Sequence, residues 1–201
     1  MSGIAPIGRR QQNKLETRRR LLAAARELLG ARGADATVEE IAERAEVSRA
    51  TFFNYFPSKD DLIAALYGEL MGLFAQVVDR MLAQPISTYE RVVGVFTDFA
   101  RSSIDQPEYM RVVTGEIERI YAASESQSEL SHLFTVEVRR LIEPGLAQGD
   151  VRTDHPVDFL ARMVGAIYMQ TMRYWRIDPD LDLGETFERA GCFAAESIAP
   201  R

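Results

Sequence analysis

Apolar residues recur along most of this chain at the three- and four-residue spacing of helices that bury one face. The first strong stripe covers about residues 15–32 and stops before Gly33, a residue suited to ending a helix. No window alternates apolar and polar residues over the length of a strand with turn dipeptides on both sides. The pattern therefore predicts an all-α protein.

Capping residues and prolines divide the pattern into nine predicted helices. Thr37 with Glu40, and Ser87 with Glu90, have the spacing of capping boxes, and Ser48 is a good N-cap. The predicted ranges are 15–32, 37–44, 49–56, 58–84, 87–103, 107–120, a helix ending near 149, 156–176 and 183–198.

The predicted helices fall into an N-terminal and a C-terminal group, preceded by a polar arm. We expect a flexible basic arm over residues 1–14, a helix-turn-helix domain over residues 15–62, and a helical domain over residues 63–201. Phe52 and Phe56 lie four residues apart and should face inward from the third helix. The outward face or its edge would then carry Arg49, Ala50, Thr51, Phe53 and Asn54.

Charge separates the same two groups. The 201 residues have a net charge of −6, which for the whole chain disfavours a polyanion as partner. Residues 1–59 hold 11 basic and 7 acidic side chains, a net charge of +4, and residues 60–201 hold 13 and 23, a net charge of −10. The basic excess near the start of the first helix suits phosphate contact, and a solubilising tail is the alternative interpretation. Its members are Arg9, Arg10, Lys14, Arg18, Arg19 and Arg20.

Several chemistries are disfavoured by composition. One cysteine, Cys192, and two histidines exclude a disulfide scaffold and make a metal site improbable, so we expect no metal and no cofactor. No run of 18 apolar residues and no signal-peptide pattern occurs, so the protein is expected to be cytoplasmic, with no membrane partner. Glu129 and His132 have the spacing of a di-iron helix motif, but the motif needs a second copy. We therefore do not expect an enzyme.

A known family pattern covers the N-terminal third. Residues 17–62, with the segments LLAAARELL and TVEEIAERAEVSRATFFNYFPSKDDL on either side of Gly33, closely resemble the DNA-binding domain of the TetR family of transcriptional regulators. The resemblance implies a homodimer that binds double-stranded DNA and a small-molecule effector of unknown identity. The function it favours is a repressor of a palindromic operator, released by that effector. The alternative is a helical dimeric adaptor, or an activator without an effector.

The resemblance also assigns roles to individual residues. It implies base or nearby phosphate contacts by Arg49, Ala50, Thr51 and Phe53, and backbone contacts by Thr37, Ser48, Tyr55 and Lys59. Arginine can pair with both acceptors of guanine, and alanine and threonine methyl groups can meet a thymine methyl. With the arm and the outward face included, the candidate DNA-binding residues are Arg18, Thr37, Ser48, Arg49, Ala50, Thr51, Phe53, Asn54, Tyr55 and Lys59.

Two positions depart from the family pattern. Glu46 stands in the turn where the family usually has glycine, and a left-handed backbone there would cost about 1 kcal/mol. Phe53 stands where tyrosine is common, so a hydroxyl contact to phosphate would be missing. Glu39 could accept from cytosine N4, although a solvated glutamate on the helix surface is the simpler interpretation.

The same resemblance implies an effector pocket among the middle helices and a dimer interface on the last two. The aromatic and methionine candidates for the pocket, which would otherwise be ordinary core residues, are Phe74, Phe96, Phe99, Tyr109, Met110, Phe134, Met163, Tyr168, Met172 and Trp175. The interface candidates are Phe159, Met163, Ala166, Ile167, Thr171, Tyr174, Phe187, Ala190, Phe193, Ala194 and Ile198.

Overall fold

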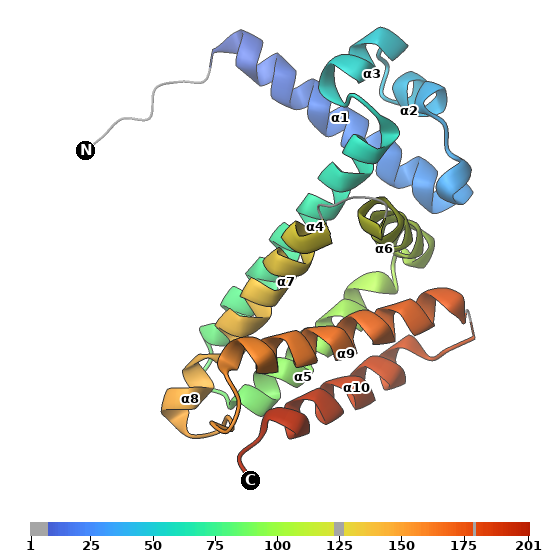
Figure 1. Ribbon diagram of the computed structural model, residues 1–201. Helices are drawn as coiled ribbons and strands as arrows, with labels where there is room; N and C mark the ends of the chain where they lie inside the picture. The colour runs from blue at the N-terminus through green and yellow to red at the C-terminus, as the bar shows by residue number, and fades with distance from the viewer. Residues whose placement is uncertain (1–7, 123–126, 179) are drawn as a thin grey trace. The chain divides into compact units, whose positions relative to one another are not determined.

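The computed structural model describes residues 8–122, 127–178 and 180–201, with side chains described outside residues 121–132. These residues form α-helices and one 3₁₀ turn, and no strand occurs among them, which confirms the expected all-α fold (Figure 1). The elements are α1 Arg9–Arg32, η1 Gly33–Asp35, α2 Val38–Arg44, α3 Arg49–Tyr55, α4 Lys59–Leu82, α5 Thr88–Ser103, α6 Pro107–Ala122, α7 Gln127–Ile142, α8 Pro144–Gln148, α9 Val157–Ile177 and α10 Leu183–Ile198.

The capping boxes expected at Thr37 and Ser87 are present, and Asp182 supplies a further helix cap. Thr37 and Ser87 each open a capping box with the glutamate three residues later, at the starts of α2 and α5. The Asp182 side chain accepts from the backbone N–H of Glu185 at 2.8 Å and caps α10. These bonds satisfy backbone donors that a helix leaves without an internal partner.

Two helix boundaries differ from the predicted ones. α1 begins at Arg9 rather than near residue 15, so the predicted flexible arm is helical from Arg9 onward, and its residues 1–7 lie outside the described part. Apolar periodicity does not detect this extension, since its residues are polar and exposed. The helix expected to end near Gly149 is instead two helices, α7 and α8. Pro144 cannot donate a helical hydrogen bond and occupies the first position of α8.

The chain divides into two compact units. Unit 1 contains residues up to Tyr67 together with Glu108–Ile117 of α6, and unit 2 contains Gly68–Pro107 and Glu118–Arg201. The predicted domain boundary at residues 62–63 lies within α4. The two units divide at Tyr67 and Gly68 of the same helix, so α4 contributes residues to both. The short segment from α6 is a part of unit 1 that sequence periodicity did not indicate.

Unit 1 has a core formed by α1, α2, α3 and the beginning of α4. Its fully buried side chains include Leu21, Leu29, Ile41, Phe52 and Leu62. The α6 segment packs on the end of α1, where a Cβ on Gly30 would lie 3.5 Å from the Cβ of Tyr109. The Arg26 guanidinium lies over the ring of Tyr109, 5.8 Å from its centroid.

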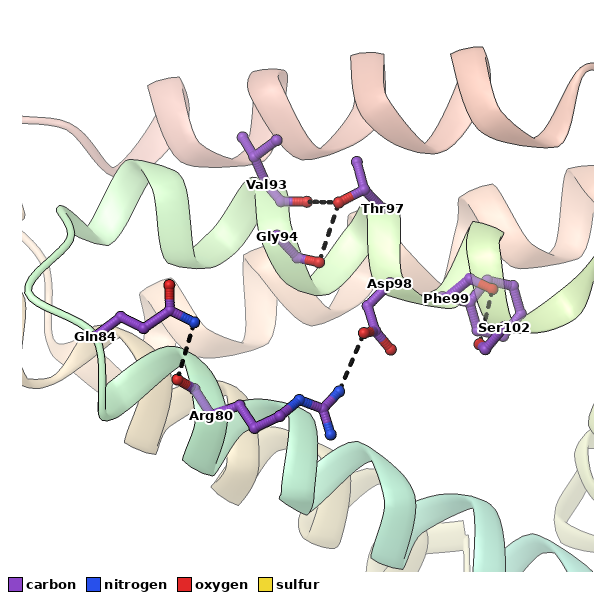
Figure 2. A network of polar contacts seen from close by, with 8 residues as sticks. All are labelled: Arg80, Gln84, Val93, Gly94, Thr97, Asp98, Phe99 and Ser102. Atoms are coloured by element: carbon purple, nitrogen blue, oxygen red, sulfur yellow. Dashed lines mark hydrogen bonds and ion pairs between the residues drawn. The ribbon is translucent and has the colours of Figure 1, made fainter.

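Unit 2 is organised by α10, which packs along α5 and against α9, while α9 also packs against α7 (Figure 1). Gly191 allows α10 to approach α5 closely, because a Cβ there would lie 3.0 Å from the Cβ of Phe96. An ion pair between Arg80 and Asp98, 3.1 Å long, connects α4 to α5 (Figure 2). Figure 2 also shows Thr97 donating to the carbonyls of Val93 and Gly94 within α5.

By length and composition alone, α4 is long and apolar enough to cross a membrane, which is weak evidence for such a span. One face of the helix is buried in the structure, while Leu73 on another face is 56% exposed. Val78 is fully buried, and the ring of Phe74 stacks on Phe134 of α7 with centroids 4.8 Å apart. Its first turn carries Asp60 and Asp61. We therefore describe α4 as an amphipathic helix that packs through one face.

Candidate nucleic-acid interface

Helices α2 and α3 are joined by a tight turn whose hydrogen bonds end α2. The Glu46 N–H donates to the Glu43 carbonyl and the Val47 N–H donates to the Ala42 carbonyl, each at 2.9 Å. This pair of bonds is a Schellman motif, which places its penultimate residue in the left-handed region. Glu46 occupies that place with a φ of 55°. A non-glycine residue there costs about 1 kcal/mol.

Helix α3 is amphipathic over its seven residues. Phe52 is fully buried, and its ring contacts that of Phe56 with centroids 5.9 Å apart. The opposite face is open, with exposed or half-exposed side chains at Arg49, Ala50, Thr51, Phe53, Asn54 and Tyr55. Ser48 caps the helix by accepting from the Thr51 N–H at 3.0 Å. The burial of Phe52 therefore leaves a rigid helix face with base-reading residue types open to a partner.

Arg49 is held at two points. Its Nε lies 2.9 Å from the Oε1 of Glu39 on α2, and its guanidinium carbon lies 5.5 Å from the centroid of the Phe53 ring. Periodicity placed Glu39 on a helix surface but did not bring it to Arg49. The contact depends on how α2 and α3 cross.

Other basic side chains of unit 1 are also paired with carboxylates. Arg44 contacts Glu27 at 2.7 Å, Arg20 contacts Glu46 at 3.6 Å, and Arg32 contacts Glu40. Arg19 donates hydrogen bonds to Glu16, which lower the pKa of that carboxyl. The net charge of the segment thus overstates the free positive charge near the helix-turn-helix. Within the described part of the chain, Arg9, Arg10, Lys14 and Arg18 of α1 form no ion pair, and Arg18 instead lies over the Phe56 ring.

Three of the candidate DNA-binding residues, Lys59, Thr37 and Arg18, already make contacts within unit 1. The Lys59 ammonium donates to the carbonyl of Ala34 in η1. The Thr37 hydroxyl donates to the Glu40 carboxylate at 3.0 Å and accepts from the Glu40 N–H, so its single proton is already used. The Arg18 guanidinium lies 5.4 Å from the centroid of the Phe56 ring while its side chain stays exposed. Of these three residues, Arg18 is the best placed to meet a phosphate without losing a hydrogen bond.

The structure brings together most of the pocket candidates, as a packed aromatic cluster in unit 2. Tyr168 lies at its centre, with ring centroids 5.0 Å from Phe96, 5.1 Å from Phe134 and 5.6 Å from Phe99. The other buried candidates of this unit are Phe74, Met172 and Trp175. Three candidates do not join the cluster: Met163 is exposed, and Tyr109 and Met110 belong to unit 1. Phe187, an interface candidate, joins it by stacking on Phe99 at 4.8 Å.

The interface candidates divide by exposure. Four of them, Thr171, Phe187, Ala194 and Ile198, are buried inside unit 2 and present no free surface. Ile167 and Ala190 are half-buried. The exposed candidates on α9 and α10 are Phe159, Met163, Ala166, Tyr174 and Phe193, and Ile177 of α9 is a further exposed apolar residue.

Glu118 of α6 is a charged residue that the sequence did not single out. It pairs with Arg173 at 3.5 Å and with Arg176, both on α9. Burial lowers the pKa of Arg176. Because all three residues belong to unit 2, this cluster fixes the end of α6 on α9.

An exposed recognition-type helix, joined through α4 to an acidic helical unit, defines the class of helix-turn-helix DNA-binding regulators. Residues 21–66 match the family described as "Bacterial regulatory proteins, tetR family". Residues 21–66 are therefore similar to the DNA-binding domain of the TetR family of transcriptional regulators.

Known relatives agree with this family. An uncharacterized HTH-type transcriptional regulator of Mycobacterium tuberculosis is 40% identical over 101 residues, which are 50% of this chain and 44% of the relative. The HTH-type transcriptional regulator BetI of Brucella melitensis is 29% identical over 126 residues, which are 62% of this chain and 61% of BetI. The chain thus spans less than two thirds of the length of either curated relative.

Solved structures extend the likeness over nearly the whole chain. The TetR-family repressor FadR of Thermus thermophilus, crystallised with lauroyl-CoA, has a TM-score of 0.71 and 27% identity, covering 92% of this chain and 96% of that one. FadR of Bacillus subtilis, in complex with stearoyl-CoA, has a TM-score of 0.75 at 18% identity, covering 90% and 98%, and shows the fold alone.

Proposed function

We propose that this protein is a cytoplasmic transcriptional repressor, without enzymatic activity, that binds a palindromic operator as a homodimer. The observation that carries the proposal is the open face of α3, which presents Arg49, Ala50 and Asn54 while Phe52 anchors the helix. A helix of this kind enters the major groove of DNA, where arginine and asparagine read guanine and adenine. The nearby exposed Arg18 would contact the phosphate backbone.

The homodimer is supported by the exposed apolar residues of α9 and α10. Phe193 is 64% exposed and Tyr174 is 58% exposed, and exposed apolar side chains that form a contiguous patch commonly mark an interface. Two copies related by a two-fold axis would present two α3 helices to a palindromic site. Sedimentation analysis of the purified protein tests this step, and a monomer at micromolar concentration would contradict it.

We propose that an effector with an apolar chain binds in unit 2. The interior of this unit contains aromatic rings that pack on Tyr168, and aromatic side chains favour contact with apolar groups. The similar FadR of Thermus thermophilus was crystallised with lauroyl-CoA, which supports the same chemical class. Because these rings contact one another, the chain of a ligand would have to separate them and fill the space.

Effector binding would act on DNA through α4, since this helix contributes residues to both units. A ligand that favours one arrangement of α4 would change the spacing of the two recognition helices. A coupling free energy of about 1–3 kcal/mol changes operator affinity by about 5- to 150-fold.

Selection of binding sites from random duplex DNA tests the proposed function most directly. We expect recovery of a two-fold symmetric site, with half-sites about one helical turn or a multiple of it apart. Mobility shifts on that duplex should weaken steeply with salt, since phosphate contacts release counterions. Failure to enrich any sequence would contradict the DNA-binding function.

Lauroyl-CoA is the first effector probe, with free coenzyme A as its control. We expect lauroyl-CoA alone to raise the melting temperature and to release the selected duplex. If neither lauroyl-CoA nor the corresponding free fatty acid changes either measurement, the effector is not of the apolar-chain class. If the protein nevertheless binds the selected duplex, the result favours a regulator that works without an apolar-chain ligand.

A further inference from the structure

Glu39 and Arg49 form an ion pair between the two helices of the helix-turn-helix. Glu39 is the second residue of α2 and Arg49 is the first residue of α3, and Arg49 Nε lies 2.9 Å from Glu39 Oε1. Phe53 lies one helical turn further along α3, and the centroid of its ring is 5.5 Å from the guanidinium carbon of Arg49. The guanidinium is thus held by a carboxylate at one edge and by an aromatic ring beside it.

The position of Arg49 needs such support. The start of a helix carries partial positive charge, so an arginine at the first residue of α3 has no favourable interaction with its own helix dipole. The Glu39 carboxylate supplies the opposite charge. It also lies in the first turn of α2, where a negative charge is favourable.

Stability does not account for the pair. The side chains of Arg49 and Glu39 are 66% and 58% exposed, and ion pairs at this exposure contribute little to the free energy of unfolding. An acidic residue next to a DNA-reading helix also repels phosphate. Its placement is explained if the carboxylate sets the orientation of the arginine.

The contact leaves a defined part of the guanidinium free. The closest contact of Glu39 is with Nε, at the side edge of the planar guanidinium, and this edge is distinct from the end formed by one N–H each of Nη1 and Nη2. Two terminal N–H groups can donate to O6 and N7 of one guanine. A long side chain held in this way loses less rotational freedom when it binds DNA.

We propose that Glu39 is a specificity-determining positioning residue, which orients Arg49 for end-on recognition of a guanine. This inference rests on the proposed DNA-binding function and deepens it. It differs from direct recognition of cytosine N4 by Glu39, because the carboxylate acts through Arg49.

The test measures discrimination with the duplex selected by the wild-type protein. R49A identifies the base pair that the arginine reads, as the position where preference is lost by about 5- to 150-fold. Discrimination is then the ratio of the Kd for a duplex changed at that base pair to the Kd for the selected duplex. It is measured for the wild type, E39A, E39Q, R49A and the E39A/R49A double variant.

We expect E39A to lower discrimination by about 2- to 5-fold, the effect of losing an exposed ion pair. Its affinity for random duplex DNA should stay equal or rise, because a negative charge is removed. E39Q retains an acceptor oxygen and should fall between the wild type and E39A. In the R49A background, removal of Glu39 should change discrimination no further.

The control variant is E27A, which removes a carboxylate from the Arg44–Glu27 pair in the same unit. That pair has matched side-chain exposures of 56% and 55% and does not involve α3. E27A should keep wild-type discrimination. If it loses as much as E39A, the effect comes from a general change in charge or folding, and the proposal is wrong.

Three further results would overturn the inference. Unchanged discrimination in both E39A and E39Q would show that Arg49 needs no positioning. An equal loss with and without Arg49 would show that Glu39 reads a base itself. A wild-type protein that selects no DNA sequence would contradict the proposed function, which distinguishes that failure from the other two.

Discussion

Asp150 accepts two hydrogen bonds from Thr88, one from the backbone N–H at 2.7 Å and one from the hydroxyl at 2.8 Å. Thr88 is the first residue of α5 and is 1% exposed, and Asp150 follows α8, 62 residues later. The Arg91 guanidinium, 2% exposed, donates to the Thr88 hydroxyl and to the Gln148 side chain. This polar cluster holds the segment after α8 against the start of α5.

Removal of the Asp150 carboxylate should destabilise unit 2. D150A leaves the buried Thr88 hydroxyl and N–H without their acceptor, which costs about 1–3 kcal/mol in the free energy of unfolding. Urea unfolding followed by circular dichroism measures the change. D180A, at an exposed residue before α10, serves as the control and should shift the midpoint far less.

Gly145 should not tolerate a side chain. A Cβ at this position would lie 2.3 Å from Thr88 Oγ1 and 2.5 Å from Asp150 Oδ1, so G145A should destabilise by about 1–3 kcal/mol through overpacking. Apart from its chain neighbours and the backbone of its own helix, no described atom lies within 4 Å of the place that a Cβ on Gly72 in α4 would take. G72A should therefore stabilise by about 0.5–1 kcal/mol, the usual gain of alanine over glycine in a helix. Equal effects of the two substitutions would contradict this account.

The protein should be more stable with glycine than with glutamate at position 46. E46G relieves the left-handed backbone, at φ 55°, and loses only a 3.6 Å pair with Arg20 in which the Glu46 side chain is 86% exposed. We expect a gain of about 1 kcal/mol in the free energy of unfolding. E43G, inside α2, should instead lose about 1 kcal/mol. A loss in both variants would show that the ordinary cost of glycine outweighs the relief at the turn.

Phe187 and Phe193 of α10 should respond in opposite ways to truncation. Phe187 is 0% exposed and stacks on Phe99, so F187A should lose about 3–5 kcal/mol of stability. Phe193 is 64% exposed, so F193A should change monomer stability little and weaken self-association. Chemical unfolding and sedimentation equilibrium separate these effects. Unchanged self-association of F193A would remove this residue from the proposed interface.

The capping box of α5 should contribute less stability in acid. Hydrogen bonds from the Ser87 hydroxyl and N–H lower the pKa of Glu90 below its ordinary value of 4.5. A carboxyl with a lowered folded-state pKa stabilises fully above its unfolded-state pKa and loses this contribution as pH falls through the folded-state value. The wild type should therefore have a larger free energy of unfolding than E90Q at pH 7, and urea unfolding should show this difference shrinking as pH falls below 4.5. E188Q, at an exposed residue of α10, is the control, and an unchanged advantage would contradict the role of the charge.

Helix content and local caps could be predicted from the sequence because they depend on nearby residues. Thr37 with Glu40, and Ser87 with Glu90, form their boxes from residues three apart, and the burial of Phe52 follows from helical spacing. The left-handed turn at Glu46 likewise lies in a short segment with a recognisable family pattern. These features require no knowledge of how distant segments meet.

Tertiary packing decided which of the candidate residues are free and which are engaged. Phe187 and Phe193 have similar chemistry on one helix, and only the contact of α10 with α5 and α9 buries one and exposes the other. Lys59 donates to Ala34, and Arg49 pairs with Glu39, through contacts across 25 and 10 residues of chain. Composition and periodicity established a helical protein with a basic N-terminal region, whereas the crossing of α2 and α3 determined which of its charges face outward, since charge pairing depends on distances that local spacing does not define.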